Sequence, residues 1–281
     1  MRNFEGKVAA ITGAGSGLGR ALALALAREG CRVALSDVDE DGLAATAQQV
    51  QAAGGVASTA RVDVADRVAV QAWAEACRNR HGRVNLLFNN AGVALAAPAD
   101  TVRPEDFAWV MDVNFWGVVH GTQAFLPQLR ASGEGHVVNI SSVFGLMAMP
   151  TQSAYNASKF AVRGYTEALR MELELEGAPV SATCVHPGGV ATNIANAQRI
   201  AADAQRLTGL DAAAQRARAR ALIDRTAPDE AARQILAGVR RNARRVLVGA
   251  DARMADAMVR LLATAYQPLL LRSLRRLKGK A

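Results

Sequence analysis

A tyrosine and a lysine lie four residues apart in the segment SAYNASK, residues 153–159. Residues at this spacing share one face of a helix, so the phenol of Tyr155 and the ammonium of Lys159 can converge. A cation near a phenol favours the ionised form and lowers its pKa from about 10. Such a pair would suit acid–base chemistry near neutral pH. The alternative is a surface tyrosine and a solvated lysine on an ordinary helix, the usual meaning of an isolated YxxxK pattern.

Two more polar residues could join this pair. Ser142 follows a predicted strand, His136–Ser141, and precedes Tyr155 by 13 residues across a loop, so both side chains could face one cleft. Asn114 lies within a predicted long helix, where an isolated asparagine usually has only a local packing role. The spacing therefore indicates Tyr155, Lys159 and Ser142 as candidate catalytic residues and leaves Asn114 open; their meaning depends on the elements that position them.

Short β-branched runs alternate with longer helical patterns along the chain. The predicted strands are Val8–Ile11, Arg32–Ser36, Val56–Val62, Val84–Asn89, His136–Ser141, Val180–His186 and Val246–Val248. The predicted helices are Leu18–Glu29, Glu40–Ala53, Arg67–Arg80, Pro104–Ala131, Ala154–Glu176 and Pro228–Asn242. This alternation predicts an α/β fold, a doubly wound, Rossmann-like, seven-stranded parallel sheet with helices on both faces, in a single domain. Ligands of such sheets bind beyond the carboxyl ends of the strands.

A glycine cluster, TGAGSGLG, follows the first predicted strand and opens a helix. Gly13, Gly17 and Gly19 permit positive φ and close approach of the backbone, and the helix N-terminus offers free N–H groups to a pyrophosphate. A glycine cluster alone is weak evidence. Its place in the first β-α-β unit predicts a dinucleotide site.

A carboxylate, Asp37, ends the second predicted strand, 18 residues after Gly19. A carboxylate at this point accepts hydrogen bonds from the adenosine ribose 2′-hydroxyl and repels a 2′-phosphate. No basic residue nearby offers a clamp for such a phosphate, so we predict NAD rather than NADP. The alternative is that Asp37 only caps the next helix.

Two further strand ends carry polar residues. Asp63 follows the third predicted strand, and the segment NNAG at 89–92 ends the fourth. Each alone is more typical of a helix cap or a turn. At the ends of successive strands they fit the walls of an adenosine pocket.

Composition excludes several classes of protein. The chain has 281 residues, of which 51% are hydrophobic, so it can bury a sizeable core. Its three cysteines are far apart in sequence, which indicates neither a metal site nor a disulfide framework and is consistent with a reducing cytoplasm. The N-terminus lacks an apolar signal core, and no apolar run approaches the roughly 18 residues that span a bilayer.

The net charge of +8 is concentrated at the C-terminus. Six basic and no acidic residues lie in 257–281, and without them 27 basic residues face 25 acidic ones. A nearly neutral body argues against a nucleic-acid partner. Residues 251–281 are predicted to form a basic amphipathic extension, with Leu270, Leu274 and Leu277 on one side. These leucines could pack on the body or on a neighbouring subunit, or the helix could lie on an anionic membrane surface.

Together these motifs resemble those of the one-domain short-chain dehydrogenases/reductases, over about residues 4–250. The matches are TGxxxGxG at 12–19, NNAG at 89–92, Asn114, Ser142, Tyr155-x-x-x-Lys159 and HPGGVAT at 186–192. They occur in the family's order and with its spacings. The resemblance implies a cytoplasmic NAD-dependent oxidoreductase that transfers a hydride between the nicotinamide and a secondary alcohol or ketone.

The resemblance also implies roles for residues. Tyr155 would be the general acid/base, Lys159 would lower its pKa and hold the nicotinamide ribose, Ser142 would bind the substrate oxygen, and Asn114 would hold a water of a proton relay. The implied cofactor-binding positions are Gly13, Ser16, Gly17, Leu18, Gly19, Asp37, Asp63, Val64, Asn90, Ala91, Gly92, Tyr155, Lys159, Pro187, Gly188, Val190 and Thr192. The family further implies a homodimer or homotetramer built through helices 104–131 and 154–176.

The substrate is less clearly indicated. The Ala/Arg-rich insertion 193–227 is predicted to be helical and lies where the family carries its substrate lid. The arginines of the insertion sit among acids, which favours a solvated face over a clamp for a carboxylate. Phe144, Leu146, Met147 and Met149 follow Ser142; if they line the cleft the substrate is apolar, and otherwise they are core. A dinucleotide-responsive binding protein on the same fold remains the alternative function, because fold alone does not prove activity.

Overall fold

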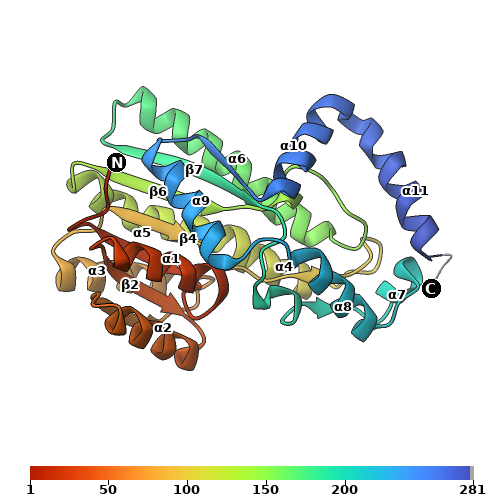
Figure 1. The fold of residues 1–281 in the computed structure, drawn as a ribbon, viewed down its shortest axis with the longest axis horizontal. Helices are drawn as coiled ribbons and strands as arrows, with labels where there is room; N and C mark the ends of the chain where they lie inside the picture. The colour runs from red at the N-terminus through yellow and green to blue at the C-terminus, as the bar shows by residue number, and fades with distance from the viewer. Residues whose placement is uncertain (279–281) are drawn as a thin grey trace.

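The computed structural model describes residues 1–278 and contains the predicted seven-stranded parallel sheet (Figure 1). The strands follow one another across the sheet in the order β3-β2-β1-β4-β6-β7-β9. Their bounds are β1 Val8–Thr12, β2 Arg32–Asp37, β3 Ala57–Arg61, β4 Leu86–Asn89, β6 Gly135–Ile140, β7 Val180–Pro187 and β9 Arg245–Val248. All neighbouring strands pair in parallel, so the predicted fold class is confirmed.

Helices cover both faces of the sheet (Figure 1). One face packs against α1 Gly17–Arg28, α2 Glu40–Ala52 and α9 Pro228–Arg240. The other packs against α3 Arg67–His81, α5 Gly117–Ala131 and α6 Ser153–Leu175. A parallel sheet covered in this way needs strands that are apolar on both sides, as in β1, whose five residues VAAIT are all buried.

Two hydrophobic clusters form the core, one on each face. Leu22 of α1 and Ile235 of α9 are fully buried on the first face. On the second, the rings of Trp73 and Phe125 meet edge to face with centroids 5.0 Å apart. Burying each large apolar side chain stabilises the fold by about 1.5–3 kcal/mol. These clusters hold the strands, and therefore the loops at their carboxyl ends, in fixed positions.

Aspartates begin two of the helices that follow the sheet strands. The side chain of Asp39 accepts a hydrogen bond from Gly42 N at 3.0 Å and caps α2. Asp66 accepts from the backbone N–H groups of Val68 and Ala69 and caps α3. Since Asp39 caps α2, the alternative that Asp37 serves this purpose is wrong.

The predicted helix Pro104–Ala131 is interrupted. It consists of α4 Pro104–Met111, a π-helical segment Asp112–Trp116 and α5. A π-turn adds one residue to the helical repeat, which apolar periodicity does not reveal, and such turns are frequent at functional sites. Asn114 lies at the centre of this segment.

The insertion 193–227 is only partly helical. It contains a 3₁₀ turn at Asn193–Ala195, a short strand β8 Arg199–Ile200, and helices α7 Ala204–Thr208 and α8 Ala212–Ile223. Strand β8 pairs in parallel with β5 Leu95–Ala96, a pairing too short to be predicted. None of the residues of α8 is buried.

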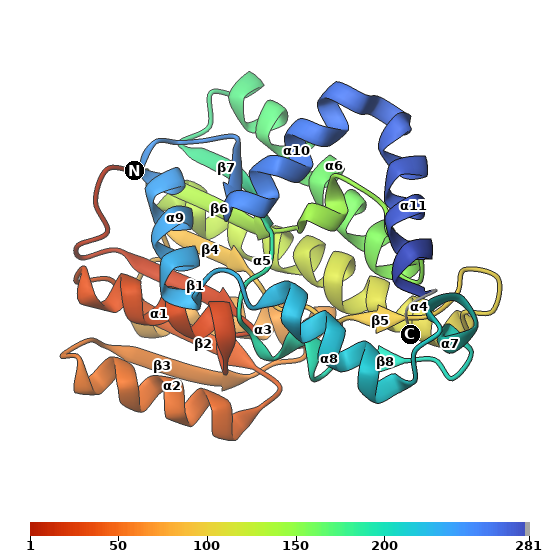
Figure 2. The same cartoon turned by 45° about the vertical axis from the view of Figure 1, so that its right-hand side comes forward.

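Two helices follow the last strand. They are α10 Ala250–Leu262 and α11 Tyr266–Lys278, and they lie along one side of the molecule (Figure 2). Leu270 packs against a cluster formed by Met147 with Ala255 of α10 and Tyr266 of α11, and Leu274 is half-buried, while Arg272 and Arg275 are exposed. Packing of the leucine side on the body, on a neighbouring subunit or on a membrane remains a prediction.

Part of the predicted extension falls outside this description. The side chains of Arg276, Leu277 and Lys278 and the whole of residues 279–281, including Lys280, lie outside the described residues. Within residues 1–278, no helix has the length and apolar composition that crossing a bilayer requires.

Candidate active site

The candidate site lies where the order of the strands reverses. Strand β1 lies between β2 and β4. After β1 the chain adds β2 and β3 on one side, and it then crosses over to add β4 and the later strands on the other side. The loops that follow β1 and β4 diverge at such a point and leave a crevice in which doubly wound sheets bind their ligands. The glycine cluster follows β1, and the NNAG segment follows β4.

The glycine loop is held by Asn90. Its side-chain Nδ2 donates to the carbonyl oxygens of Thr12, at 2.9 Å, and Gly13, at 3.0 Å. In return, the Thr12 hydroxyl accepts from the backbone N–H groups of Asn90 and Ala91, each at 3.0 Å. These four bonds fasten the start of the loop to the end of β4. Asn90 and Ala91 thus support the glycine loop from the side of β4.

The glycines of the loop occupy positions that side chains cannot. Gly13 and Gly17 have φ of +65° and +51°, in the left-handed region that favours glycine. A Cβ added to Gly19 would lie 2.1 Å from the carbonyl oxygen of Gly13. A Cβ on Gly17 would lie 3.0 Å from the Thr192 side chain, which brings the predicted residues of two distant motifs together. The loop and the start of α1 therefore form the narrow backbone cradle that a dinucleotide pyrophosphate fits.

Asp37 faces the same loop. Its carboxylate accepts from Gly15 N at 2.8 Å and from Asp39 N at 3.1 Å. On the other side of the loop, Arg20 donates to Gly15 O and, at 2.9 Å, to the hydroxyl of Thr46. The carboxylate is thus positioned by two backbone N–H groups at the edge of the cradle, where it fits a ribose hydroxyl. The supporting role of Arg20 was not predicted, because its partners lie in another segment of the chain.

The remaining predicted cofactor positions differ in what they offer. The side chains of Leu18, Val64 and Val190 are buried in the hydrophobic core, which leaves only their main chain for a ligand. Asp63 is exposed and accepts from Ala65 N at 3.0 Å. Ser16 precedes the first residue of α1, and its side chain makes no capping bond. Pro187 ends β7, and Gly188 follows it.

A residue of α10 holds the loop after β7. The carboxylate of Asp251 accepts from Gly189 N at 2.7 Å, and a Cβ added to Gly188 would lie 2.2 Å from Asp251 Oδ1. A glycine at position 188 is therefore required for this contact. The HPGG motif was identified in the sequence. Its partner Asp251, 62 residues after Gly189, could not be predicted from the sequence.

The four candidate catalytic residues come together beyond the ends of β4 and β6. Lys159 is 3% exposed, and its Nζ lies 5.6 Å from the centroid of the Tyr155 ring. The Ser142 hydroxyl lies close enough to the Tyr155 phenol to lower the pKa of that phenol, although burial has the larger, opposite effect. A Cβ on Gly92 would lie 3.2 Å from Asn114 Oδ1 and 3.5 Å from Lys159 Nζ, so this glycine leaves room between them. The alternative of a surface tyrosine and a solvated lysine is excluded.

Asn114 has all its side-chain groups engaged with the protein. Its Nδ2 donates to Val93 O at 3.0 Å and to Ser158 Oγ at 3.1 Å, and its Oδ1 accepts from Val93 N at 2.8 Å. The residue is fully buried. These bonds fasten the π-helical segment to the chain that follows β4. They give the side chain a structural role, and the predicted water relay stays a prediction.

Burial dominates the electrostatics of the pair. Removal of its hydroxyl from water raises the pKa of Tyr155 to about 12, against the opposing effect of the Ser142 hydroxyl. Burial lowers the pKa of Lys159 to about 8, and its Nζ donates to Ile140 O at 3.0 Å. The expected lowering of the Tyr155 pKa by Lys159 is therefore not found in this structure. Lys159 Nζ is directed to the backbone carbonyl of Ile140, and with a pKa of about 8 the group is still mostly protonated at pH 7.

Two residues that support the site were not predicted. His186 is fully buried, its Nδ1 lies 2.9 Å from Ser142 O, and burial lowers its pKa to about 4, so the ring is neutral at pH 7. Asn156 donates from Nδ2 to the carbonyl oxygens of Phe144 and Met147, both at 2.8 Å. Both residues lie inside predicted motifs, HPGG and YNASK, but their partners are visible only in three dimensions.

The apolar loop after Ser142 divides into two parts. Leu146 and Met147 are buried, so core packing describes them correctly. The Phe144 ring stands perpendicular to the Tyr155 ring with centroids 6.0 Å apart. One side of the Tyr155 phenol is therefore apolar.

The start of the insertion is fastened to α4. The Arg199 guanidinium lies 3.6 Å from the centroid of the Trp109 ring and pairs with Asp106 at 3.2 Å. Arg206 binds both carboxylate oxygens of Asp100, at 2.8 and 2.7 Å. These two arginines are ion-paired with carboxylates of this chain at the surface, whereas the sequence predicted a solvated face; the argument against a clamp for a carboxylate substrate stays a prediction.

Comparison of the whole chain with known proteins identifies its family. A family model described as short chain dehydrogenase matches residues 7–203. The chain is 48% identical over 269 residues to the putative oxidoreductase SadH of Mycobacterium tuberculosis, covering 96% of this chain and 95% of that protein. A short-chain dehydrogenase/reductase from Burkholderia phymatum, crystallised in complex with NAD, superposes with a TM-score of 0.83 at 33% identity and covers 97% of each chain. Levodione reductase superposes with a TM-score of 0.74 at 31% identity, covering 84% of this chain and 91% of its own. The chain belongs to the short-chain dehydrogenase/reductase family.

Proposed function

We propose that this protein is an NAD-dependent oxidoreductase that interconverts a secondary alcohol and a ketone. The observation that carries the proposal is the convergence of Tyr155, Ser142 and Lys159 beside a glycine loop shaped for a dinucleotide. NAD, when bound, supplies the acceptor or donor of the hydride. The protein supplies position, protons and hydrogen bonds.

Tyr155 exchanges the proton. With a pKa raised to about 12, the phenol is protonated at neutral pH and can donate its proton to a carbonyl oxygen during reduction. During oxidation the same oxygen receives the proton of the alcohol and must first be a phenolate. A charged Lys159 would favour that phenolate. Burial therefore favours the protonated phenol that reduction uses, and Lys159 favours the phenolate that oxidation uses.

Ser142 is suited to bind the substrate oxygen. Its hydroxyl oxygen accepts from Phe144 N at 3.1 Å, which orients the group and leaves its own hydrogen to donate. A donor held in place before the reaction stabilises negative charge on the substrate oxygen without reorganisation. The bond from His186 to Ser142 O fixes the backbone of the same residue.

Asp37 supports NAD as the cofactor rather than NADP. A ribose 2′-hydroxyl can donate to this carboxylate, whereas a 2′-phosphate would meet its negative charge. A hydrogen bond to a charged group contributes about 1.5–3 kcal/mol, or about 10- to 150-fold in affinity.

We predict that Asp37→Ser weakens NADH binding by about 10- to 100-fold and narrows or reverses the preference over NADPH. Paired fluorescence titrations with NADH and NADPH measure both effects. Asp41→Ser, four residues further along in the first turn of α2, removes the same charge from an exposed position and should leave both affinities unchanged. A wild type that prefers NADPH would refute the assignment.

An apolar substrate is favoured by Phe144, which stands next to the phenol. We expect NAD-linked oxidation across a graded series of secondary alcohols to rise in kcat/KM with apolar size, by about fourfold for each added methylene that is buried against the wall. Spectrophotometric detection of NADH measures it. No turnover of any alcohol or ketone, with tight NADH binding, would favour the dinucleotide-responsive binding protein instead.

Self-association remains a proposal as well. Trp116, at the end of the π-helical segment, and Phe160 of α6 are 47% and 41% exposed in the single chain, on the two helices through which the homodimer or homotetramer was predicted. Sedimentation velocity would return the mass of a single chain if the proposal is wrong.

A further inference from the structure

The C-terminal helices pack against the loop that follows Ser142. Tyr266, the first residue of α11, is 6% exposed and forms a buried cluster with Met147 of this loop and Ala255 of α10. Phe144 and Leu270 pack against the same cluster. The apolar side of the catalytic phenol is thus continuous with a contact made by the end of the chain.

Tyr266 also makes a directed bond to the loop. Its hydroxyl oxygen accepts a hydrogen bond from Ala148 N at 2.9 Å, across 118 residues of sequence. On the other side of the loop, Asn156 of α6 accepts from Met149 N at 3.2 Å. Two neighbouring backbone N–H groups are therefore bound by side chains from two different helices. The loop is fastened from α6 and from α11.

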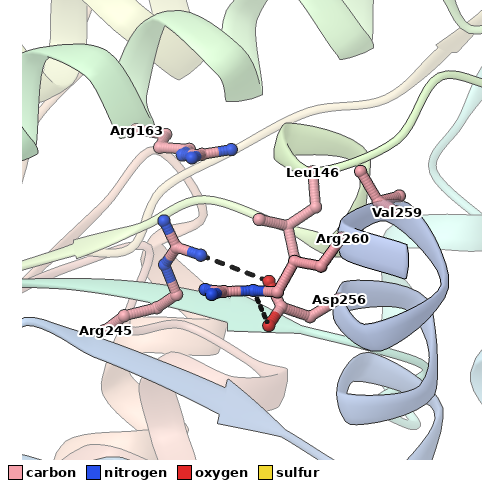
Figure 3. Close-up of a pocket in the computed structure, with 6 residues that line it drawn as sticks. All are labelled: Leu146, Arg163, Arg245, Asp256, Val259 and Arg260. Carbon is pink, nitrogen blue, oxygen red and sulfur yellow. Dashed lines mark hydrogen bonds and ion pairs between the residues drawn. The ribbon is translucent and has the colours of Figure 1, made fainter. Parts of the chain in front are cut away.

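Ion pairs place α10 against the same region (Figure 3). Asp256 of α10 binds Arg245 of β9 at 3.2 Å and Arg260 at 2.7 Å, and Arg245 binds Glu167 of α6 at 2.7 Å. Leu146 of the loop lines the pocket around these groups. Because partly exposed ion pairs contribute little to stability individually, the buried cluster and the Tyr266 hydroxyl are the stronger attachment.

We propose that Tyr266 is a positioning residue for substrate binding. By holding Ala148 N and packing on Met147, it fixes the loop that presents Phe144 to Tyr155. This inference rests on the proposed function, because Phe144 forms a substrate wall only if the phenol is catalytic. Among the described residues, the hydrogen bond and the cluster contacts of Tyr266 involve neither the glycine loop nor Lys159. Its loss should therefore change the recognition of large apolar substrates and leave cofactor binding intact.

The first test measures the loop directly by hydrogen exchange and mass spectrometry. Tyr266→Phe keeps the ring in the cluster and removes only the hydroxyl that Ala148 N uses. We expect the segment 143–152 to exchange about fivefold faster, as for the loss of one hydrogen bond of ordinary strength. Tyr165→Phe is the matched control, since it removes the same phenolic oxygen from a half-buried tyrosine that packs against the cluster of Trp73 and Phe125, on the second face of the sheet. Unchanged exchange in Tyr266→Phe would overturn the proposal.

The second test separates recognition from chemistry. Tyr266→Ala should raise KM for the largest apolar alcohol by about tenfold or more, change KM for the smallest by less than about threefold, and leave the Kd of NADH within about twofold. A general loss of stability would lower Tm and the fraction of active protein. It would not change the ratio of the KM values for the largest and the smallest alcohol. Equal KM changes for large and small alcohols would overturn the positioning role while the proposed function stands. A wild type without Tyr155-dependent turnover would instead overturn the proposed function, and with it the substrate role of Tyr266.

Discussion

Tyr155→Phe is expected to lower the turnover of the best secondary alcohol by about 10²- to 10⁴-fold, the usual contribution of a positioned proton donor or acceptor. The substitution removes one oxygen and keeps the ring that meets Phe144 edge to face, so the loop and α6 should keep their positions. NADH affinity should remain within about twofold, because the lost hydroxyl serves proton transfer, whereas the glycine loop and Asp37 are the proposed contacts of the pyrophosphate and the adenosine ribose. Steady-state kinetics and a fluorescence titration on the same preparation measure the two effects.

Tyr165, a second tyrosine of α6, provides the control. Tyr165→Phe also removes a phenolic oxygen from α6, ten residues after Tyr155, and should retain turnover within about threefold of the wild type. If Tyr155→Phe retained turnover within about tenfold of the wild type, Tyr155 would not be the acid/base. If both variants lost turnover equally, the effect would come from α6 as a whole.

The sheet could be predicted from the sequence because its strands are buried on both faces. Runs such as VAAIT in β1 and the alternation of such runs with amphipathic helices are visible without any knowledge of tertiary structure. The glycine loop could be located for a related reason: a left-handed φ at Gly13 and a backbone contact at Gly19 each require glycine, whatever surrounds them.

What could not be predicted depends on contacts between distant segments. The π-turn around Asn114 adds a single residue to a helical repeat, and β5 and β8 are two residues long. The partner of Ala148 N is Tyr266, 118 residues away. It lies in an extension that was predicted to be a basic amphipathic helix, but the sequence did not show which surface this helix contacts. Neither composition nor spacing reveals such pairs.

The pKa of Tyr155 is a further example. Helical spacing placed Lys159 near the phenol and suggested that its charge would dominate. Spacing gives no measure of burial, and in the folded chain the removal of the hydroxyl from water raises the pKa to about 12. A sequence argument predicts that two groups meet, but the direction of a pKa shift follows from their surroundings.

Gly19→Ala is expected to weaken NADH binding by at least about 100-fold, provided that the protein folds. The added Cβ would lie 2.1 Å from Gly13 O and 2.7 Å from Asn90 Nδ2, far inside normal contact distance. Neither neighbour can move easily, because Asn90 Nδ2 itself donates to Gly13 O at 3.0 Å. The clash is removed only if the glycine loop shifts away from β4. Such a shift widens the cradle that binds the pyrophosphate. Such overpacking costs about 1–3 kcal/mol of stability, so thermal unfolding should be followed beside the NADH titration.

Gly164→Ala is the matched control for this substitution. Gly164 lies on the exposed side of α6, and an added Cβ would meet no atom within 4 Å. Alanine there should raise stability by about 0.5–1 kcal/mol, since glycine is a poor helix former, and should leave NADH binding unchanged. If Gly19→Ala were folded and bound NADH as tightly as the wild type, the loop after β1 would not be the cofactor cradle. The proposed NAD-dependent function would then lack an identified cofactor site, even with the catalytic residues in place.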